Sequence, residues 1–185
     1  MSQRVQNHDI PVHILIPKEL KLGKPLIIVW IYGGYLITGA AIWLDFFLEW
    51  AAEYAIQNNA VVVMPDYRPL PESSGLDVLS DLDDSWACVE NHGGLSAFLD
   101  TVGKRDAIAS ISDTSILAYG ESAGGYLAVQ SALRRPGLVK AVIAAYPVKF
   151  LGQCVHKRRL ITTQIVEVDA DFYSVKSEGK SPFGT

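Results

Sequence analysis

Four short segments of the chain are apolar at almost every position, and they constrain the fold more than any other feature. A strand without a polar face belongs inside a parallel sheet, because helices bury both of its sides. Stretches with helical spacing of apolar residues, at 44–57, 76–89 and 123–133, separate these segments. The pattern therefore predicts an α/β fold with a mostly parallel sheet flanked by helices. The four apolar segments are residues 26–31, 60–64, 116–119 and 139–145.

Two further elements follow from local patterning. An additional strand is expected at residues 12–16, where Pro17 ends it. The helix expected at 76–89 carries an apolar stripe that starts at Leu76. This spacing places Asp77, Asp81 and Asp84 on the solvent-exposed side of that helix.

Composition limits the class of protein and of partner. The 185 residues include 16 Lys+Arg and 20 Asp+Glu, a net charge of −4, with 49% hydrophobic residues, which suits one folded domain. Mild acidity without a basic block argues against nucleic acid or an anionic membrane as partner. No apolar run approaches the about 20 residues of a membrane span, and residues 1–9 contain no apolar leader segment. We therefore expect a cytoplasmic protein.

The two cysteines, Cys88 and Cys154, are too few for a disulfide framework and lack the spacing of a zinc site. A reducing compartment is the simpler interpretation. No metal and no cofactor is expected.

Gly120-Glu121-Ser122-Ala123-Gly124 matches the nucleophile-elbow pattern Gly-x-Ser-x-Gly, between an expected strand and an expected helix. Glycine on either side leaves room for a sharp turn at Ser122. The helix that starts at Ala123 directs its first N–H groups toward a reacting oxygen. The alternative is a nucleotide-binding loop, but the sequence lacks both the Lys-Ser/Thr of a phosphate loop and the G-x-G-x-x-G spacing. The elbow is therefore the favoured hypothesis.

Gly33 and Gly34 come one residue after the first buried strand, in the stretch Tyr32-Gly33-Gly34-Tyr35. Small residues there allow backbone N–H groups to face a ligand, as an oxyanion hole requires. Taken alone, the pair is more simply an ordinary Gly-Gly turn.

Three blocks in order resemble the α/β-hydrolase fold and, within it, the hormone-sensitive-lipase-like esterases. The first block is Tyr32-Gly33-Gly34-Tyr35 with Gly39, in the place of the family's His-Gly-Gly-Gly loop. The second block, residues 66–72, is close to the family's Asp-Tyr-Arg-Leu-x-Pro-Glu segment. The third block, residues 120–125, matches its nucleophile elbow. The resemblance covers about residues 25–147. It implies a small-molecule carboxylic ester as substrate, Ser122 as nucleophile and the N–H groups of Gly33, Gly34 and Ala123 as oxyanion hole. Residues 66–72 would be structural.

The entry to the first loop departs from the family pattern. Either Ile31 or Tyr32 occupies the place of the family's histidine, depending on the alignment. His92-Gly93-Gly94 also matches the start of the family's His-Gly-Gly-Gly motif, but it follows an expected helix. We interpret it as a C-terminal helix cap.

The larger departure concerns the catalytic triad, whose acid and histidine follow the serine in this fold. His156 is the one histidine after Ser122, and it lies in a basic segment without a strand pattern; His8, His13 and His92 are not credible bases. Asp169 and Asp171 come after His156, which is the wrong order. We therefore expect residues 1–147 to form a hydrolase core that lacks its last strands. Residues 148–185 would be an irregular segment, with 149–168 a candidate insert.

Three functional interpretations stay open at this point. The first is a serine hydrolase that is weak or inactive as this chain. The second is a relative that binds a small hydrophobic ligand without turnover, as the gibberellin receptors of this family do. The third is a chain that folds poorly, because an apolar last strand would leave an open sheet edge.

Overall fold

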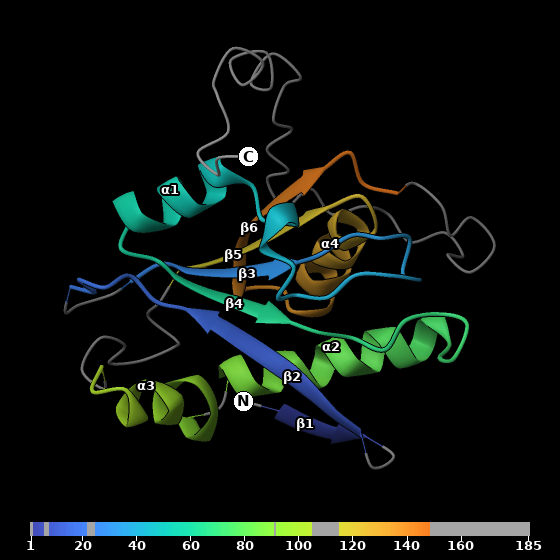
Figure 1. Cartoon of the computed structure of the whole chain (residues 1–185), viewed down its shortest axis with the longest axis horizontal. Helices are drawn as coiled ribbons and strands as arrows, with labels where there is room; N and C mark the ends of the chain where they lie inside the picture. The colour runs from blue at the N-terminus through green and yellow to red at the C-terminus, as the bar shows by residue number, and fades with distance from the viewer. Residues whose placement is uncertain (1, 6–7, 22–24, 91, 105–114, 149–185) are drawn as a thin grey trace, which may run out of the picture.

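The computed structural model describes residues 2–5, 8–21, 25–90, 92–104 and 115–148, and its strands form one six-stranded sheet (Figure 1). The order is β1-β2-β4-β3-β5-β6. β2 pairs antiparallel with β1 and β4, whereas the pairs β4–β3, β3–β5 and β5–β6 are parallel. The predicted α/β fold with a mostly parallel sheet is thus confirmed. The strands are β1 (Ser2–Val5), β2 (His8–Leu15), β3 (Ile27–Ile31), β4 (Val61–Pro65), β5 (Ile116–Glu121) and β6 (Val139–Ala145).

The three central strands contain the residues that the sequence pattern marked as buried. Every residue of β3 and β4 is buried, and in β5 all but the last residue are. Side chains on both faces of these strands are therefore covered, as their uninterrupted apolar runs require. Residues 149–185, and with them the predicted irregular segment and candidate insert, lie outside the described residues.

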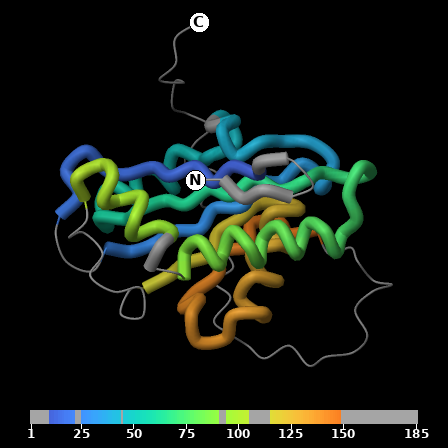
Figure 2. The backbone as a smooth tube through the Cα atoms, turned by 90° about the horizontal axis from the view of Figure 1, so that it is seen from below, coloured from blue at the N-terminus to red at the C-terminus, as the bar shows by residue number. Residues whose placement is uncertain are grey.

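Helices cover the two faces of the sheet. α2 and α4 lie together on one face (Figure 2), where the indole Nε1 of Trp86 donates to Ser131 Oγ at 2.9 Å. α1 lies across the sheet from them, and its Trp50 meets Tyr119 of β5 edge-to-face at 5.1 Å. Among the described residues, none of the helices has the length and apolarity to cross a bilayer. The helical segments are η1 (Leu44–Phe46), α1 (Glu49–Gln57), α2 (Gly75–Glu90), η2 (His92–Ser96), α3 (Ala97–Thr101) and α4 (Ala123–Arg134).

The exposed side of α2 differs from the sequence prediction. Asp81, predicted to face solvent, is fully buried, while Leu76 is 79% exposed. Arg68, from the segment after β4, causes the difference: its guanidinium and its backbone N–H both donate to the Asp81 carboxylate. A buried carboxylate is tolerated only with such a charged and hydrogen-bonded partner. Helical periodicity alone does not reveal that partner.

The interpretation of His92-Gly93-Gly94 as a helix cap is wrong. Residues His92–Ser96 form a π-helical segment that continues from α2 toward α3. A Cβ on Gly94 would lie 1.9 Å from the carbonyl oxygen of Cys88. This glycine is therefore needed for close packing on the last turn of α2, and not for a left-handed terminal residue.

The parallel strands all end at one edge of the sheet, where four connections meet. The loop after β3, the segment after β4, the turn from β5 into α4 and the residues after β6 all leave the sheet there. Ligands of open α/β sheets bind outside this carboxyl edge. It is the place where the sequence blocks 32–39, 66–72 and 120–125 come together.

Candidate active site

Ser122 lies at the turn between β5 and α4, in a backbone conformation that few non-glycine residues adopt. Its φ is 52° and its ψ is −119°. Such a conformation is strained for a residue with a Cβ, and it persists only where neighbouring contacts enforce it. The side chain is half-buried, at the amino end of α4. There the first N–H groups of the helix have no acceptor within the helix.

Glycines make this turn possible because neighbouring backbone leaves no room for a Cβ. A Cβ on Gly120 would lie 2.2 Å from the carbonyl oxygen of Gly124. On Gly124 it would lie 1.9 Å from that of Ile31, the last residue of β3. The first residues of α4 therefore pack directly onto the ends of β5 and β3. A larger side chain at either position would push the Ser122 turn away from the sheet.

The residues after β6 hold the Ser122 turn from the other side. The N–H of Ser122 donates to the carbonyl of Ala145 at 3.0 Å, and the carbonyl of Ser122 accepts from Val148 N–H at 3.0 Å. Tyr146, between these two partners, also has a positive φ of 35°. Both backbone polar groups of the strained residue are therefore satisfied by the same short segment.

Gly33 lies directly against Ser122. A Cβ on Gly33 would be 3.3 Å from the Ser122 Cβ and 2.9 Å from the carbonyl oxygen of Glu121. Gly34, with a φ of 88°, starts a tight turn in which its carbonyl accepts from the N–H groups of Ile37 and Thr38. The structure thus brings Gly33 next to Glu121 and Ser122, with Gly34 as the next residue of the loop.

Tyr32 and Tyr67 fix the loop that carries the two glycines. Their rings stack at 4.4 Å with an interplanar angle of 8°. Each hydroxyl donates to the other residue's carbonyl, and Tyr67 also donates to the carbonyl of Gly33 at 3.0 Å. Burial raises the pKa of both phenols well above the usual range, with the charge of Asp66 adding to the effect. Both phenols are therefore neutral donors. Tyr32 is a core residue in this loop, whichever alignment with the family loop is chosen.

Asp66 connects the same loop to β2. Its Oδ1 accepts from the N–H of Ala41 at 2.7 Å, and its Oδ2 lies 3.2 Å from His13 Nε2. The N–H of Leu70 donates to the carbonyl of Leu36 at 2.7 Å. Residues 66–72 thus act as a structural support of the glycine loop, in agreement with what the family resemblance implies.

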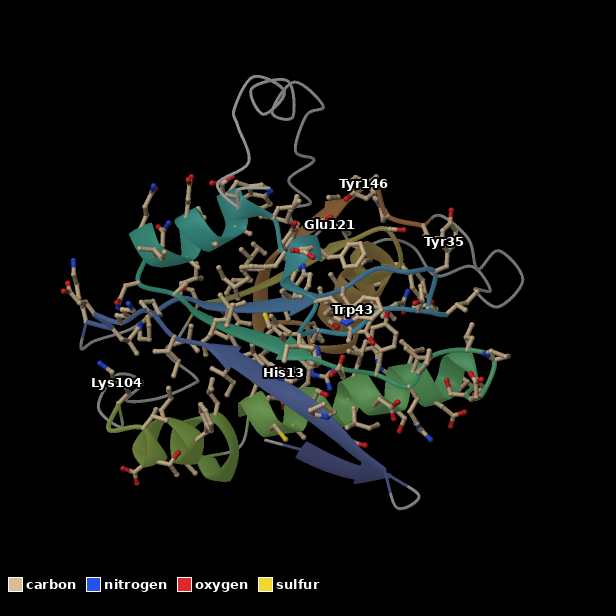
Figure 3. The ribbon with its side chains drawn as sticks, in the orientation of Figure 1. His13, Tyr35, Trp43, Lys104, Glu121 and Tyr146 are labelled. Atoms are coloured by element: carbon tan, nitrogen blue, oxygen red, sulfur yellow. The ribbon has the colours of Figure 1, made fainter. Side chains whose placement is uncertain are left out.

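Glu121 is a residue of this region that the sequence analysis did not single out. Its carboxylate accepts from the hydroxyls of Tyr119 and Tyr146. Figure 3 shows Glu121 and Tyr146 at the carboxyl end of the sheet, and Tyr35 at the same end. The two phenols tie the residue before Ser122 to the segment after β6. The only sequence signal was its place inside the Gly-x-Ser-x-Gly block.

No histidine among the described side chains is placed beside Ser122. The ring of His13 is bound to Asp66, as described, and the side chains of His8, His92 and His156 are outside the described set. In the same part of the chain, no group of three or more His, Cys, Asp or Glu side chains could hold a metal ion. What the described residues bring together is the Ser122 turn at the head of α4 and the backbone of Gly33.

With this geometry in place, comparison with known proteins decides the family. The family described as alpha/beta hydrolase fold matches residues 28–178, which is most of the chain. The chain belongs to the alpha/beta hydrolase fold family. The resemblance found in the three sequence blocks is therefore confirmed.

A curated relative and two solved structures are similar to this member of the family. A probable carboxylesterase, M8, from Phoma sp. is 31% identical over 149 residues, which are 77% of this chain and 44% of the relative. A fungal esterase from Rhizomucor miehei superposes with a TM-score of 0.58 at 19% identity, over 80% of this chain and 43% of that one. Thermogutta terrifontis esterase 2, phosphonylated by cyclosarin, superposes with a TM-score of 0.57 at 20% identity, over 86% of this chain and 60% of that one. The chain therefore spans less than half of its curated relative.

Proposed function

We propose that this alpha/beta hydrolase is a serine hydrolase of carboxylic esters. The observation that carries the proposal is the strained backbone of Ser122 at the head of α4, with Gly33 packed against it. A hydroxyl raised on such a turn is exposed to an incoming carbonyl carbon, which is the purpose of a nucleophile elbow. The carboxylesterase name of the Phoma relative supports the same reaction class.

In the proposed reaction the Ser122 oxygen attacks the ester carbonyl. The carbonyl oxygen becomes an oxyanion that accepts from the N–H groups of Gly33, Gly34 and Ala123. Preorganised donors of this kind are each worth about 10²–10³ in rate. The alcohol then leaves with a proton, and water hydrolyses the acyl-serine to release the carboxylic acid and restore the hydroxyl.

The proposal includes weak activity for the chain as it stands. A serine hydroxyl needs a histidine base that is oriented by an acid. His13, the histidine whose side chain is described, is bound to Asp66. Without a base, the oxyanion hole and substrate binding still provide about 10³–10⁴ over water. The same observation favours a second candidate, a relative that binds a small hydrophobic ligand without turnover.

Labelling with a fluorophosphonate probe tests the proposal, and a structural neighbour, the Thermogutta esterase, is phosphonylated. We expect Ser122 to be labelled and Ser122→Ala to be unlabelled. Ser80→Ala is the matched control, because Ser80 is an exposed serine on α2, and it should label like the unmodified chain. Saturable binding of a p-nitrophenyl ester with no labelling and no turnover would instead establish the second candidate. A folded chain that does neither would refute both.

A further inference from the structure

A cavity lies at the end of the sheet opposite Ser122. The pocket has a volume of about 650 Å³ and is bordered by the end of β2, the start of β4 and one side of α1. Leu15 of β2 pairs with Val62 of β4, and both line it. Because β4 starts there, the pocket is at the amino edge of the parallel strands, whereas Ser122 follows the carboxyl end of β5. Its size is within the range of about 300–1,000 Å³ that is typical of small-molecule sites.

The cavity exists because α1 presents small side chains to it. Ala52 and Ala55, one helical turn apart, form the wall on the side of α1. Ile56 adjoins them and is 68% exposed, although it is a large apolar residue. Phe47 closes the wall at the start of the helix. An open cavity with such a lining leaves apolar surface in contact with water, and a ligand chain would remove that contact.

The segment opposite α1 is held in place by hydrogen bonds. The N–H of Lys21 donates to Asn59 Oδ1 at 2.7 Å, and Asn59 Nδ2 donates back to the carbonyl of Lys21 at 3.0 Å. Asn59 lies in the turn between α1 and β4, with a φ of 53°. The ammonium of Lys104 donates to the carbonyl of Lys18 at 3.3 Å. These contacts fix the two sides of the pocket relative to each other, so that the cavity is preformed.

The charged residues of the pocket are predominantly basic. Lys18, Lys21 and Glu19 line it and are exposed, so their charged groups lie on its solvent side. A third ammonium group, that of Lys104, is hydrogen-bonded to the backbone carbonyl of Lys18, and Figure 3 shows Lys104 at this end of the sheet. The chain as a whole has a net charge of −4. This pocket thus carries a local excess of ammonium groups beside its apolar walls, although the chain as a whole is acidic.

We propose that this pocket binds a medium-chain alkyl carboxylate. The alkyl chain lies along the apolar walls formed by α1, β2 and β4, and the carboxylate accepts charge-assisted hydrogen bonds from Lys18 and Lys21. The apolar walls account for the chain, and the lysines select an anionic headgroup over a neutral or cationic one. The site is independent of Ser122 and of the proposed hydrolysis.

Calorimetric titration of the full chain with decanoate, below its micelle concentration, tests this site. We expect saturable binding at least tenfold tighter than that of decanol, decyltrimethylammonium or acetate. The double variant Lys18→Glu/Lys21→Glu should weaken decanoate binding at least tenfold. Lys140→Glu, at an exposed position on the far edge strand β6, should leave it unchanged. Equal binding of decanol, or an unaffected double variant, would overturn the role of the lysines.

Three more measurements locate the ligand and separate this site from the proposed active site. Ser122→Ala should bind decanoate unchanged, whether or not Ser122 is a nucleophile. Ala52→Phe, which fills the pocket from its half-buried wall, should abolish binding while its unfolding by urea stays cooperative. Amide NMR shifts on adding decanoate should cluster in residues 15–21 and in α1. Shifts around Ser122 instead, or no binding at all, would refute the proposal.

Discussion

Replacing Ser122 by glycine is expected to give a more stable chain than replacing it by alanine. Both substitutions remove the hydroxyl, so that the comparison isolates the Cβ. With a φ of 52° and a ψ of −119°, a residue with a Cβ is strained at this position, whereas glycine is not. The packing of Gly33 against the Ser122 Cβ acts in the same direction.

The magnitude follows from two opposing contributions. Strain of this kind costs about 1–3 kcal/mol. Glycine loses about 0.5–1 kcal/mol more conformational entropy on folding than alanine does. The free energy of unfolding of Ser122→Gly should therefore exceed that of Ser122→Ala by about 1 kcal/mol. In a chain of this size that corresponds to about 2–4 °C in melting temperature.

Urea denaturation of the two variants measures the difference, and Ser80 provides the control. Ser80 is exposed inside α2, where glycine is less favourable than alanine by about 1 kcal/mol. The order of stability should therefore reverse between the two positions. If alanine were as stable as glycine at position 122, the serine would not be strained. The observation that carries the proposed function would then be lost.

Three further substitutions probe the surroundings of the site by urea denaturation. Gly124→Ala should destabilise the fold by about 2–3 kcal/mol because its Cβ meets backbone, while Gly75→Ala, with open space around it, should stay within about 0.5 kcal/mol. Asp81→Asn should cost about 2–3 kcal/mol because it removes the charge from a buried carboxylate that accepts from a guanidinium. Asp45→Asn, at an exposed position, should cost under about 0.5 kcal/mol, and equal effects of the two substitutions would contradict the pairing of Asp81 with Arg68. The raised pKa of Tyr67 favours its neutral form in the folded state. The free energy of unfolding should therefore fall as the pH rises above about 10. Tyr67→Phe should reduce the slope of the free energy of unfolding against pH by about 1.4 kcal/mol per pH unit. An unchanged slope would argue against a buried, neutral phenol.

The burial of the central strands could be predicted because burial on both faces is visible in each segment by itself, whereas their order in the sheet was not predicted. The uninterrupted apolar runs of β3, β4 and β5 carry this information residue by residue. The turn at Ser122 was predictable for a similar reason, since the glycines that it needs lie within two positions of it. At both places the structure follows from residues that are neighbours in the sequence.

The contacts that support the candidate site could not be predicted in this way. The burial of Asp81 depends on Arg68, 13 positions away, and the helical period by itself placed this carboxylate in water. The position of the glycine loop depends on the stacking of Tyr32 on Tyr67, 35 positions apart. Such pairs form only when the sheet brings separate segments together.

What the sequence determined by itself is the class of fold and the location of the turn at Ser122, because both follow from patterns among neighbouring residues. The tertiary structure alone decided which polar groups are buried, what holds the glycine loop against Ser122, and that small side chains on α1 leave a cavity over β2 and β4. These features depend on the volume and direction of side chains from distant segments. Periodicity along one segment carries no information about them.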